Sequence, residues 1–536
     1  MKKYLFSLLI SLLAVAELSA RDIVLLEGEY EMQWGPNCCI DPMKYAGLAG
    51  GDSIIVSVKD INGYAQCSVR DKQNGWKELT PELSYFLVKG DFAFEVSDSL
   101  AQALRHHSMM FAGTNFTITK VVLRTKRPAD TRIGYDELCD KQATWNTRQI
   151  YQLLRDIYGK KSISCSMAEV NWNYKEAEYV KAWTGKCPAM NGYDYIHLTY
   201  GWEPYKDITP VKEWWDMGGL VTICWHWRAP STEQEWIAYQ KDTKKDPPSF
   251  IGFYAPGGGS PDTQFSPKEA IKEGTWQHDF LMADLEKVAD RLLLLQDAGI
   301  VVLWRPFHEA AGNSGVYQDG KAWFWWGSDG AEPCRKLWHI MYNYFQQRGL
   351  HNLIWIWNCQ INDDEWYPGD EYVDIVGRDL YNYTATPQKE GDEQAKYNSA
   401  SWSFEFMNTY YPHKMLTLSE CGNSPMMTDM WEAGAKWLFA MPWYHYQYQL
   451  GQKHQWAGSE WWNNWFDMDN VITLDDMKAL RATYLNQSPS QILQPEGAVV
   501  KNDVSDNNWY SLSGQKMIQP QAKGIYIHHG RKVVVK

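Results

Sequence analysis

The sequence lacks the features typical of membrane-spanning, nucleic-acid-binding and disulfide-framework proteins. No apolar run is long enough for a confident membrane span, and the 536-residue chain has a net charge of −13, with no basic excess to neutralise phosphates. The ten cysteines include no Cys-x-x-Cys pair, and no disulfide pairing can be read from their spacing. We therefore expect no membrane span and no nucleic-acid partner, and we expect a monomer.

Two common catalytic motifs are also absent. The glycines at 257–259 are not followed by Gly-Lys-Ser/Thr, so they do not form a phosphate-binding loop. His308 and Glu309 begin like a zinc-protease motif, but Gly312 occupies the position of the required second histidine. The sequence thus indicates neither a cofactor nor a metal.

Aromatic residues, by contrast, are abundant. The chain has 29 tryptophans and 32 tyrosines, whose flat rings can stack on the apolar faces of sugars or simply fill the core of a large fold. Ordinary packing is the better reading for most of the tryptophans. Together with the acidic charge, the aromatic content favours a neutral substrate.

The first twenty residues have the pattern of a secretory signal peptide. Two lysines precede an apolar stretch at 5–16, and small residues follow at 19–20. We therefore expect a secreted protein that is periplasmic, at the cell surface or extracellular.

Residues 21–127 are predicted to form a small all-β sandwich. Short alternating runs occur at 22–26, 53–58, 65–69, 85–88, 92–96 and 116–123. The last run resembles the closing strand of galactose-binding-like jelly rolls, the fold of many carbohydrate-binding modules. This resemblance makes Trp34 and Trp76 candidate sugar platforms, with core or interdomain packing as the alternative.

Residues 128–486 are predicted to form a (β/α)8 TIM barrel, an α/β fold. Helical patterns such as 280–297 alternate with eight apolar strand candidates: 162–167, 193–198, 220–225, 300–304, 353–357, 373–380, 415–419 and 437–443. Residues 487–536 are predicted to be a linker followed by a small β-rich tail.

Two glutamates follow buried strand candidates of this barrel. Glu309 lies after the fourth strand and Glu420 directly after the seventh, so both are expected at the catalytic rim. Retaining glycoside hydrolysis requires a protonated and an ionised carboxyl group about 5 to 5.5 Å apart. The pair therefore predicts glycosidase chemistry.

The motifs around these glutamates carry a family resemblance. Trp-Arg-Pro-Phe-His-Glu at 304–309, Trp-Phe-Trp-Trp-Gly at 323–327, Trp-His-Trp at 225–227 and Ser-Glu-Cys-Gly at 419–422 resemble glycoside hydrolase family 26, whose principal members are endo-β-1,4-mannanases. The resemblance covers 142–485. It implies that Glu309 is the general acid/base and Glu420 the nucleophile.

The resemblance also implies five substrate-binding residues. His308 would orient the site, Trp323 would stack on the leaving-group side and Tyr381 would hydrogen-bond the nucleophile. His226 would line the glycone side and Trp443 would lie under the cleaved sugar. Two alternatives stay open, a structural role for His226 and either Trp461 or Trp462 as the last platform. The segment 310–322 is longer than is usual in the family.

The expected function is that of a secreted retaining endo-β-1,4-mannanase, which hydrolyses internal β-mannosidic bonds of mannan, galactomannan or glucomannan by double displacement. A β-glucanase or xylanase on the same barrel is the nearest alternative. A non-catalytic glycan-binding protein is the alternative from another class.

Overall fold

The computed structural model describes residues 20–35, 37–127, 132, 134–169, 172–199, 204–241, 251–315, 319–382, 399–445 and 454–486, and four strands between 509 and 535. The chain divides into two compact units, Met1–Leu485 and Asn486–Lys536. Residues 1–19 of the predicted signal peptide lie outside the described residues. A search of the described helices for one long and apolar enough to cross a membrane finds none.

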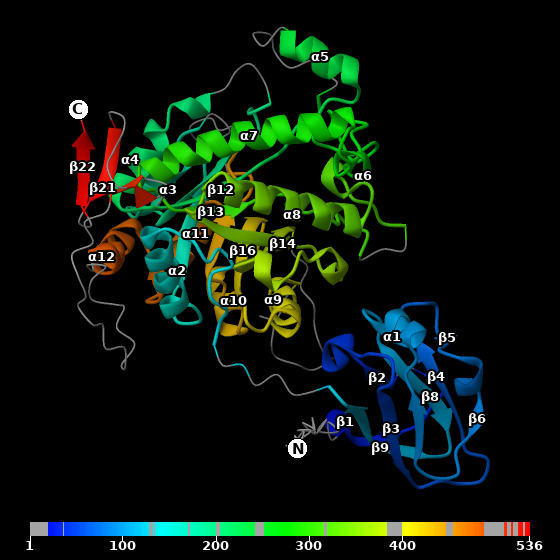
Figure 1. The fold of residues 1–536 in the computed structure, drawn as a ribbon. Helices are drawn as coiled ribbons and strands as arrows, with labels where there is room; N and C mark the ends of the chain where they lie inside the picture. Colours follow the sequence, from blue (N-terminus) through cyan, green and yellow to red (C-terminus); the bar gives the residue numbers. More distant parts are fainter. Residues whose placement is uncertain are drawn as a thin grey trace, which may run out of the picture. The chain divides into compact units, whose positions relative to one another are not determined.

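The N-terminal region is an all-β sandwich, as predicted (Figure 1). One antiparallel sheet has the order β1-β9-β3-β7, and the other has the order β2-β8-β4-β5 with β6 paired to β4. The two sheets share one core, in which Ile54 and Val56 pack with Cys67 and Val69. The elements are β1 (Arg21–Glu31), β2 (Cys38–Ile40), η1 (Pro42–Tyr45), β3 (Ser53–Lys59), β4 (Gln66–Asp71), β5 (Lys77–Glu78), η2 (Pro81–Leu83), β6 (Phe86–Leu87), β7 (Phe92–Glu95), α1 (Asp98–Leu104), β8 (Met109–Thr114) and β9 (Thr117–Thr125).

Strand β8 was not indicated by the sequence. Its first five residues are all buried, so the strand lacks the alternation of buried and exposed side chains by which a half-buried strand is recognised. The sandwich therefore has a central strand that is covered on both faces.

The predicted eight-stranded parallel barrel is present and closed. Its sheet order is β11-β12-β13-β14-β15-β16-β17-β10, and β10 also pairs with β11. A short strand, β18, pairs with β10 outside the ring. The strands are β10 (Ser162–Met167), β11 (Met190–Asp194), β12 (Leu220–Cys224), β13 (Val302–Arg305), β14 (Leu353–Cys359), β15 (Ile375–Tyr381), β16 (Met415–Gly422), β17 (Phe439–Pro442) and β18 (Val471–Ile472).

The second barrel strand is shifted from its predicted position. The sequence predicted 193–198, whereas β11 spans Met190–Asp194 and the chain turns directly after it, with Leu198 N–H donating to Tyr195 C=O at 2.9 Å. The apolar run continues into this turn because Tyr195 and Leu198 are buried there and Ile196 is partly buried. Burial beyond the strand therefore moved the predicted strand toward the turn.

Helices surround the barrel strands (Figure 1). In α7, Thr275 caps the first turn by accepting a hydrogen bond from His278 N–H, and Leu281, Leu285, Val288 and Leu292 form its buried stripe. The helices are α2 (Trp145–Ile157), α3 (Lys175–Thr184), η3 (Pro204–Lys206), α4 (Thr209–Met217), α5 (Glu233–Lys241), α6 (Pro267–Ala270), α7 (Trp276–Asp297), η4 (Trp325–Gly327), α8 (Ala331–Gln347), η5 (Asp364–Trp366), η6 (Asp370–Tyr372), α9 (Ser399–Tyr410), α10 (Met427–Glu432), α11 (Ser459–Phe466) and α12 (Leu474–Leu485).

The second unit contains one antiparallel sheet of order β20-β19-β21-β22. Its strands are β19 (Trp509–Ser511), β20 (Lys516–Met517), β21 (Gly524–His528) and β22 (Arg531–Val535).

Candidate active site

A cavity of about 460 Å³ opens at the carboxyl ends of the barrel strands. Parallel barrels place their functional side chains at this end. All seven predicted site residues line the cavity, and seven further residues complete its wall. The lining comprises His226, Tyr254, His308, Glu309, Trp323, Phe324, Gln360, Arg378, Asp379, Leu380, Tyr381, Glu420, Trp443 and Trp456.

Glu309 lies four residues beyond the end of β13 on a turn with unusual backbone geometry. Its φ is +52°, a conformation that side-chain-bearing residues rarely adopt and that is typically retained at functional sites. Its N–H donates to Asn358 Oδ1 at 2.9 Å, and its Oε2 accepts from Trp323 Nε1 at 2.7 Å. The turn therefore directs a doubly anchored glutamate into the cavity.

Glu420 lies within β16, two residues before its end. A register irregularity between β15 and β16 places Glu420 directly opposite Asp379. Its Oε2 accepts a hydrogen bond from Tyr381 OH at 2.9 Å, and its Oε1 forms an ion pair with Arg305. Glu420 is thus held from two sides.

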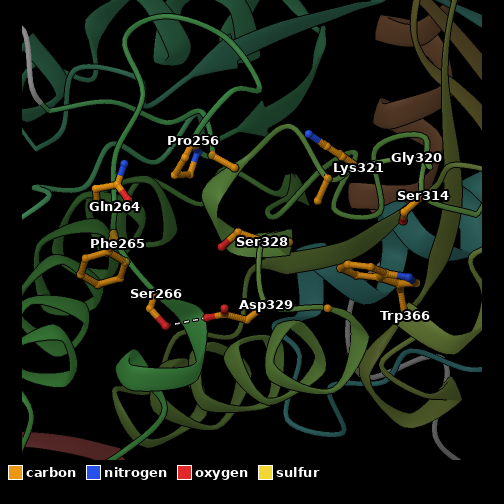
Figure 2. Close-up of a pocket in the computed structure, with 14 residues that line it drawn as sticks. Pro256, Gln264, Phe265, Ser266, Ser314, Gly320, Lys321, Ser328, Asp329 and Trp366 are labelled. Carbon is orange, nitrogen blue, oxygen red and sulfur yellow. Dashed lines mark hydrogen bonds between the residues drawn. The ribbon is translucent and has the colours of Figure 1, made fainter.

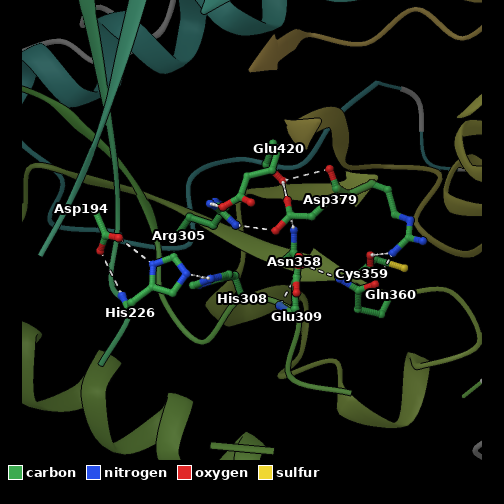
Figure 3. A network of polar contacts seen from close by, with 12 residues as sticks. Asp194, His226, Arg305, His308, Glu309, Asn358, Cys359, Gln360, Asp379 and Glu420 are labelled. Carbon is green, nitrogen blue, oxygen red and sulfur yellow. Dashed lines mark hydrogen bonds and ion pairs between the residues drawn. The ribbon is translucent and has the colours of Figure 1, made fainter. Parts of the chain in front are cut away.

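A buried polar network connects the two glutamates (Figure 3). Arg305 pairs with Asp379 Oδ2 at 2.7 Å as well as with Glu420. Asp379 Oδ1 accepts from Asn358 Nδ2 at 2.7 Å and from Ser419 Oγ at 2.9 Å. A charge this deeply buried requires such partners, because burial without them is strongly unfavourable.

The two glutamates have different electrostatic surroundings. Burial, together with the nearby Asp379 and Glu420 carboxylates, raises the pKa of Glu309 well above its ordinary value. Burial also raises the pKa of Glu420, to about 7, but the ion pair and hydrogen bond with Arg305 oppose that effect. Arg305 acts on Glu309 only at longer range. Glu420 is therefore the first of the two to ionise, and Glu309 keeps its proton longer.

Three carboxylates converge in the cavity. One oxygen each of Glu309, Asp379 and Glu420 lies within 4.8 Å of the others, a separation that could also hold a metal ion. Both oxygens of Asp379 are already engaged by protein donors, and the Arg305 guanidinium supplies positive charge between Asp379 and Glu420. The donor set therefore favours charge compensation by arginine over metal binding.

His226 and His308 form a short chain with Asp194 (Figure 3). Asp194 Oδ2 lies 2.6 Å from His226 Nδ1, and the two Nε2 atoms are 3.2 Å apart. Although burial opposes it, the Asp194 carboxylate raises the pKa of His226, whereas burial and His226 hold the pKa of His308 well below its usual range. Of the two histidines, His226 takes up a proton more readily, and in its charged form it donates to His308 and favours the ionised form of Glu420.

Aromatic rings form much of the remaining wall. Trp443 directly follows β17 and lines the cavity, with its ring 5.8 Å from that of His226. Trp461 and Trp462, the competing platform candidates, are instead buried on α11 outside the lining. Trp456, which lines the cavity 5.1 Å from the Tyr381 ring, was not indicated by the sequence because it belongs to no regular element.

The described residues of the long segment 310–322 contribute part of the wall of a second cavity, of about 580 Å³ (Figure 2). Ser314, Gly320 and Lys321 line this cavity on one side, and Trp366 of η5 also contributes to it. Trp323, the next residue after the segment, lines the first cavity instead. The described part of the segment, 310–315 and 319–322, therefore borders a cavity other than the one that Glu309 lines.

Comparisons with known proteins agree with this geometry. Residues 139–471 match the model of glycosyl hydrolase family 26. A mannan endo-1,4-β-mannosidase of Thermothelomyces thermophilus is 29% identical over 373 residues, which cover 68% of each chain.

Two solved structures are also similar to this chain. One is the GH26 domain of an endo-β-mannanase/endo-β-glucanase from Prevotella bryantii, which is 41% identical with a TM-score of 0.55 and covers 63% of this chain and 98% of that one. The other is a β-mannanase from a symbiotic protist of the termite Reticulitermes speratus, complexed with a gluco-manno-oligosaccharide. It is 30% identical with a TM-score of 0.52, and the match covers 65% of this chain and 99% of that one. The chain therefore belongs to glycosyl hydrolase family 26 and is a glycoside hydrolase.

Proposed function

We propose that the protein is a retaining endo-β-1,4-mannanase that hydrolyses internal β-mannosidic bonds of mannan, galactomannan or glucomannan by double displacement. The observation that carries this proposal is the pair of buried carboxyl groups, Glu309 and Glu420, whose oxygens lie within 4.8 Å and whose proton affinities differ. So short a separation leaves no room for the water of an inverting mechanism. The names of the relatives support mannan as the substrate.

In the first step, ionised Glu420 attacks the anomeric carbon of the bound sugar. The glycosidic C–O bond breaks, and Glu309 gives its proton to the departing oxygen. The products of this step are a glycosyl ester on Glu420 and a shortened chain with a new hydroxyl group. Glu309 is left as a carboxylate.

In the second step, Glu309 acts as a base. It takes a proton from a water molecule, whose oxygen attacks the anomeric carbon while the ester bond to Glu420 breaks. The sugar leaves with its original anomeric configuration, and both glutamates return to their starting protonation states.

The surrounding residues support these two steps. Arg305 and Tyr381 hold Glu420 and favour its charged form, and burial together with Glu420 keeps the Tyr381 hydroxyl protonated by raising its pKa. Trp323 fixes Glu309 by its hydrogen bond and presents its ring to the leaving-group side. His226, His308 and Trp443 line the part of the cavity that we assign to the glycone sugar.

We further propose that the enzyme is secreted. The pattern of residues 1–20 supports export, and a polymer such as mannan is degraded outside the cell that uses it. Amino-terminal sequencing of the protein released from its native host tests this proposal, and a mature chain that begins at residue 21 is expected.

The decisive experiment is hydrolysis of mannohexaose followed by proton NMR. The β-anomer should appear first at the new reducing end and should then mutarotate, and internal bonds should be cut. Glu420→Ala should abolish turnover of mannan with the fold intact, whereas Glu460→Ala on the exposed start of α11 should not. Initial release of the α-anomer, or near-full activity of Glu420→Ala, would contradict the mechanism.

Mixed-linkage glucan and xylan, assayed beside mannan, test the nearest alternative substrates. Preference for either of them would replace mannan in the proposal and leave the two-carboxylate mechanism unchanged.

A further inference from the structure

The N-terminal sandwich contains a cavity of its own, remote in sequence from the catalytic residues. Its volume is about 370 Å³, and every residue that lines it belongs to the sandwich. The lining comprises Trp34, Gly35, Arg70, Trp76, Tyr85, Met110 and Ala112. We call this cavity the sandwich site.

The floor of the sandwich site is the face of a sheet that does not pack on the domain core. Along β8, Met109 and Phe111 belong to the core, so the intervening Met110 and the following Ala112 point to the opposite face. Met110 and Ala112 are nevertheless only 2% exposed. This face is therefore covered by other side chains and is not an ordinary solvated sheet surface.

Three aromatic side chains rise around this floor and remain open to solvent. Trp34 is 48% exposed, Trp76 is 40% exposed and Tyr85 is 50% exposed. The rings of Trp34 and Tyr85 are 5.6 Å apart and tilted by 42°. Large apolar rings grouped in this way around a concavity mark a binding site more often than a solvated surface.

The backbone holds two of these rings in place at a conformational cost. Trp76 has a φ of +64° and Tyr85 a φ of +52°, and bulky residues adopt this left-handed region rarely. Such strain persists where the surrounding structure enforces it, and it concentrates at ligand-binding sites. The outward placement of the two rings is therefore built into the turns that carry them.

The polar group of the site is Arg70, and its charge is compensated. Its Nη2 donates to Tyr85 OH at 2.5 Å, its Nε donates to Ser68 Oγ at 3.1 Å, and an ion pair joins it to Glu78 at 3.3 Å. The guanidinium has five N–H donors, so it can also serve ligand hydroxyl groups. Because Glu78 balances the positive charge, the site does not select an anionic ligand.

We propose that the sandwich site binds a neutral β-1,4-linked hexopyranose chain. Such a sugar presents C–H faces that match the rings of Trp34 and Trp76, and hydroxyl groups that match Arg70 and Tyr85. This binding function is separate from hydrolysis by the barrel, and the proposal does not depend on which substrate the barrel cleaves. Its covalent link to the barrel raises the local concentration of the hydrolase at a polymer that both recognise.

Titration calorimetry of the full chain with mannohexaose tests this site. The Glu420→Ala background prevents hydrolysis and keeps the barrel cleft as one binding site. We expect a stoichiometry of two sugars per chain in this background, and of one after Trp34→Ala or Trp76→Ala is added. Tyr64→Ala is the matched control, because Tyr64 is 65% exposed in the same domain but does not line the site. It should leave two binding events.

Insoluble mannan provides a second measurement. Trp34→Ala should weaken adsorption of the Glu420→Ala chain at least tenfold, whereas in the active enzyme Trp34→Ala should leave kcat/KM for soluble mannotriose unchanged. An unchanged thermal unfolding midpoint shows that the sandwich remains folded, and Trp34 is suited to this test because it lies outside regular secondary structure.

Three results would overturn the proposal. The first is a single binding event in the Glu420→Ala chain, with mannohexaose and also with cellohexaose, that does not change when Trp34→Ala is added. The second is a loss of the second binding event in Tyr64→Ala equal to the loss in Trp34→Ala. The third is a second site that takes only hexagalacturonate, which would show an anionic ligand. A second event with cellohexaose alone supports the proposal and identifies glucose as the sugar. Failure of the barrel to cleave mannan would reject the proposed hydrolytic function without affecting the count of binding events in the sandwich.

Discussion

At the scale of single residues, the indole of Trp323 tunes Glu309, the glutamate that we propose as the acid/base. Its N–H donates to Glu309 at 2.7 Å, and this hydrogen bond favours the charged carboxylate and so lowers the pKa of Glu309. Trp323→Phe removes the donor and keeps a ring. We expect the alkaline limb of the kcat/KM profile to move to higher pH, because Glu309 then holds its proton longer. A pH profile with mannopentaose measures the shift, and a limb that stays in place or moves to lower pH would contradict it.

Glu309→Gln should remove the alkaline limb altogether. The amide cannot deliver a proton, so activity on mannan should fall by about 10²- to 10⁴-fold. Substrates with a good leaving group need little protonation and should lose much less of their first-step rate. A burst of aryl leaving group from a dinitrophenyl β-mannoside, followed by slow turnover, is the expected signature. Equal losses on both substrates would assign the acid role to another residue.

The seven site residues predicted from the sequence all line one cavity, but the charges that support them were not predicted. Arg305 lies inside a quoted motif, yet its partner Asp379 is 74 positions away in the sequence. No local pattern shows which distant carboxylate a buried guanidinium will meet. The sequence did offer one signal of this network, the charge of Arg305 at the end of an apolar strand. A buried charge at such a position requires a partner of opposite charge.

At the scale of elements, barrel strands such as β12, β13 and β14 were predictable because burial on both faces gives them apolar runs. The same rule explains one shifted and one missed strand, whereas β2 and β5, of three and two residues, were missed because they are short. The partly buried turn after β11 extended an apolar run beyond its strand, and β8 of the sandwich lacked alternation because its second face is covered. An apolar run reports burial, whereas the alternation of apolar and polar residues reports strand geometry directly.

The barrel strands β13, β15 and β16 are joined by the buried ion pairs of Arg305 with Asp379 and Glu420. Arg305→Met leaves two carboxylates buried without their cation and should destabilise the fold by about 3 to 5 kcal/mol. Without Arg305, the pKa of Glu420 rises further above its unfolded value, so the stability deficit should be smallest in acid and should grow as the pH rises. Urea unfolding between pH 4 and 8 measures both effects.

Lys336→Met on α8 is the control for this measurement. Lys336 forms an exposed ion pair with Glu332 four residues earlier, and loss of such a pair costs about 0 to 1 kcal/mol. A similar loss in the two variants, or an Arg305→Met deficit that grows in acid, would count against a buried electrostatic role.

At the scale of the whole molecule, all ten cysteines are described and none forms a disulfide. Burial raises the pKa of the thiols of Cys38 and Cys334 to about 12 and that of Cys187 to about 11. Because the thiolate is the species that forms disulfides, such thiols are inert at neutral pH even in an oxidising compartment. Alkylation in denaturant without reductant should therefore add ten groups per chain by mass spectrometry. An even deficit in that number would reveal disulfide bonds.

Asn358 on β14 links the two glutamates through its side-chain amide. Its carbonyl oxygen receives the N–H of Glu309, and its amide group donates to Asp379, which shares Arg305 with Glu420. The gap between the two glutamates is thus spanned by a side chain from a barrel strand and not by the loops that line the cleft. Exchange of those loops could change the polymer that is cut, while the anomeric form of every product would remain a property of the barrel itself.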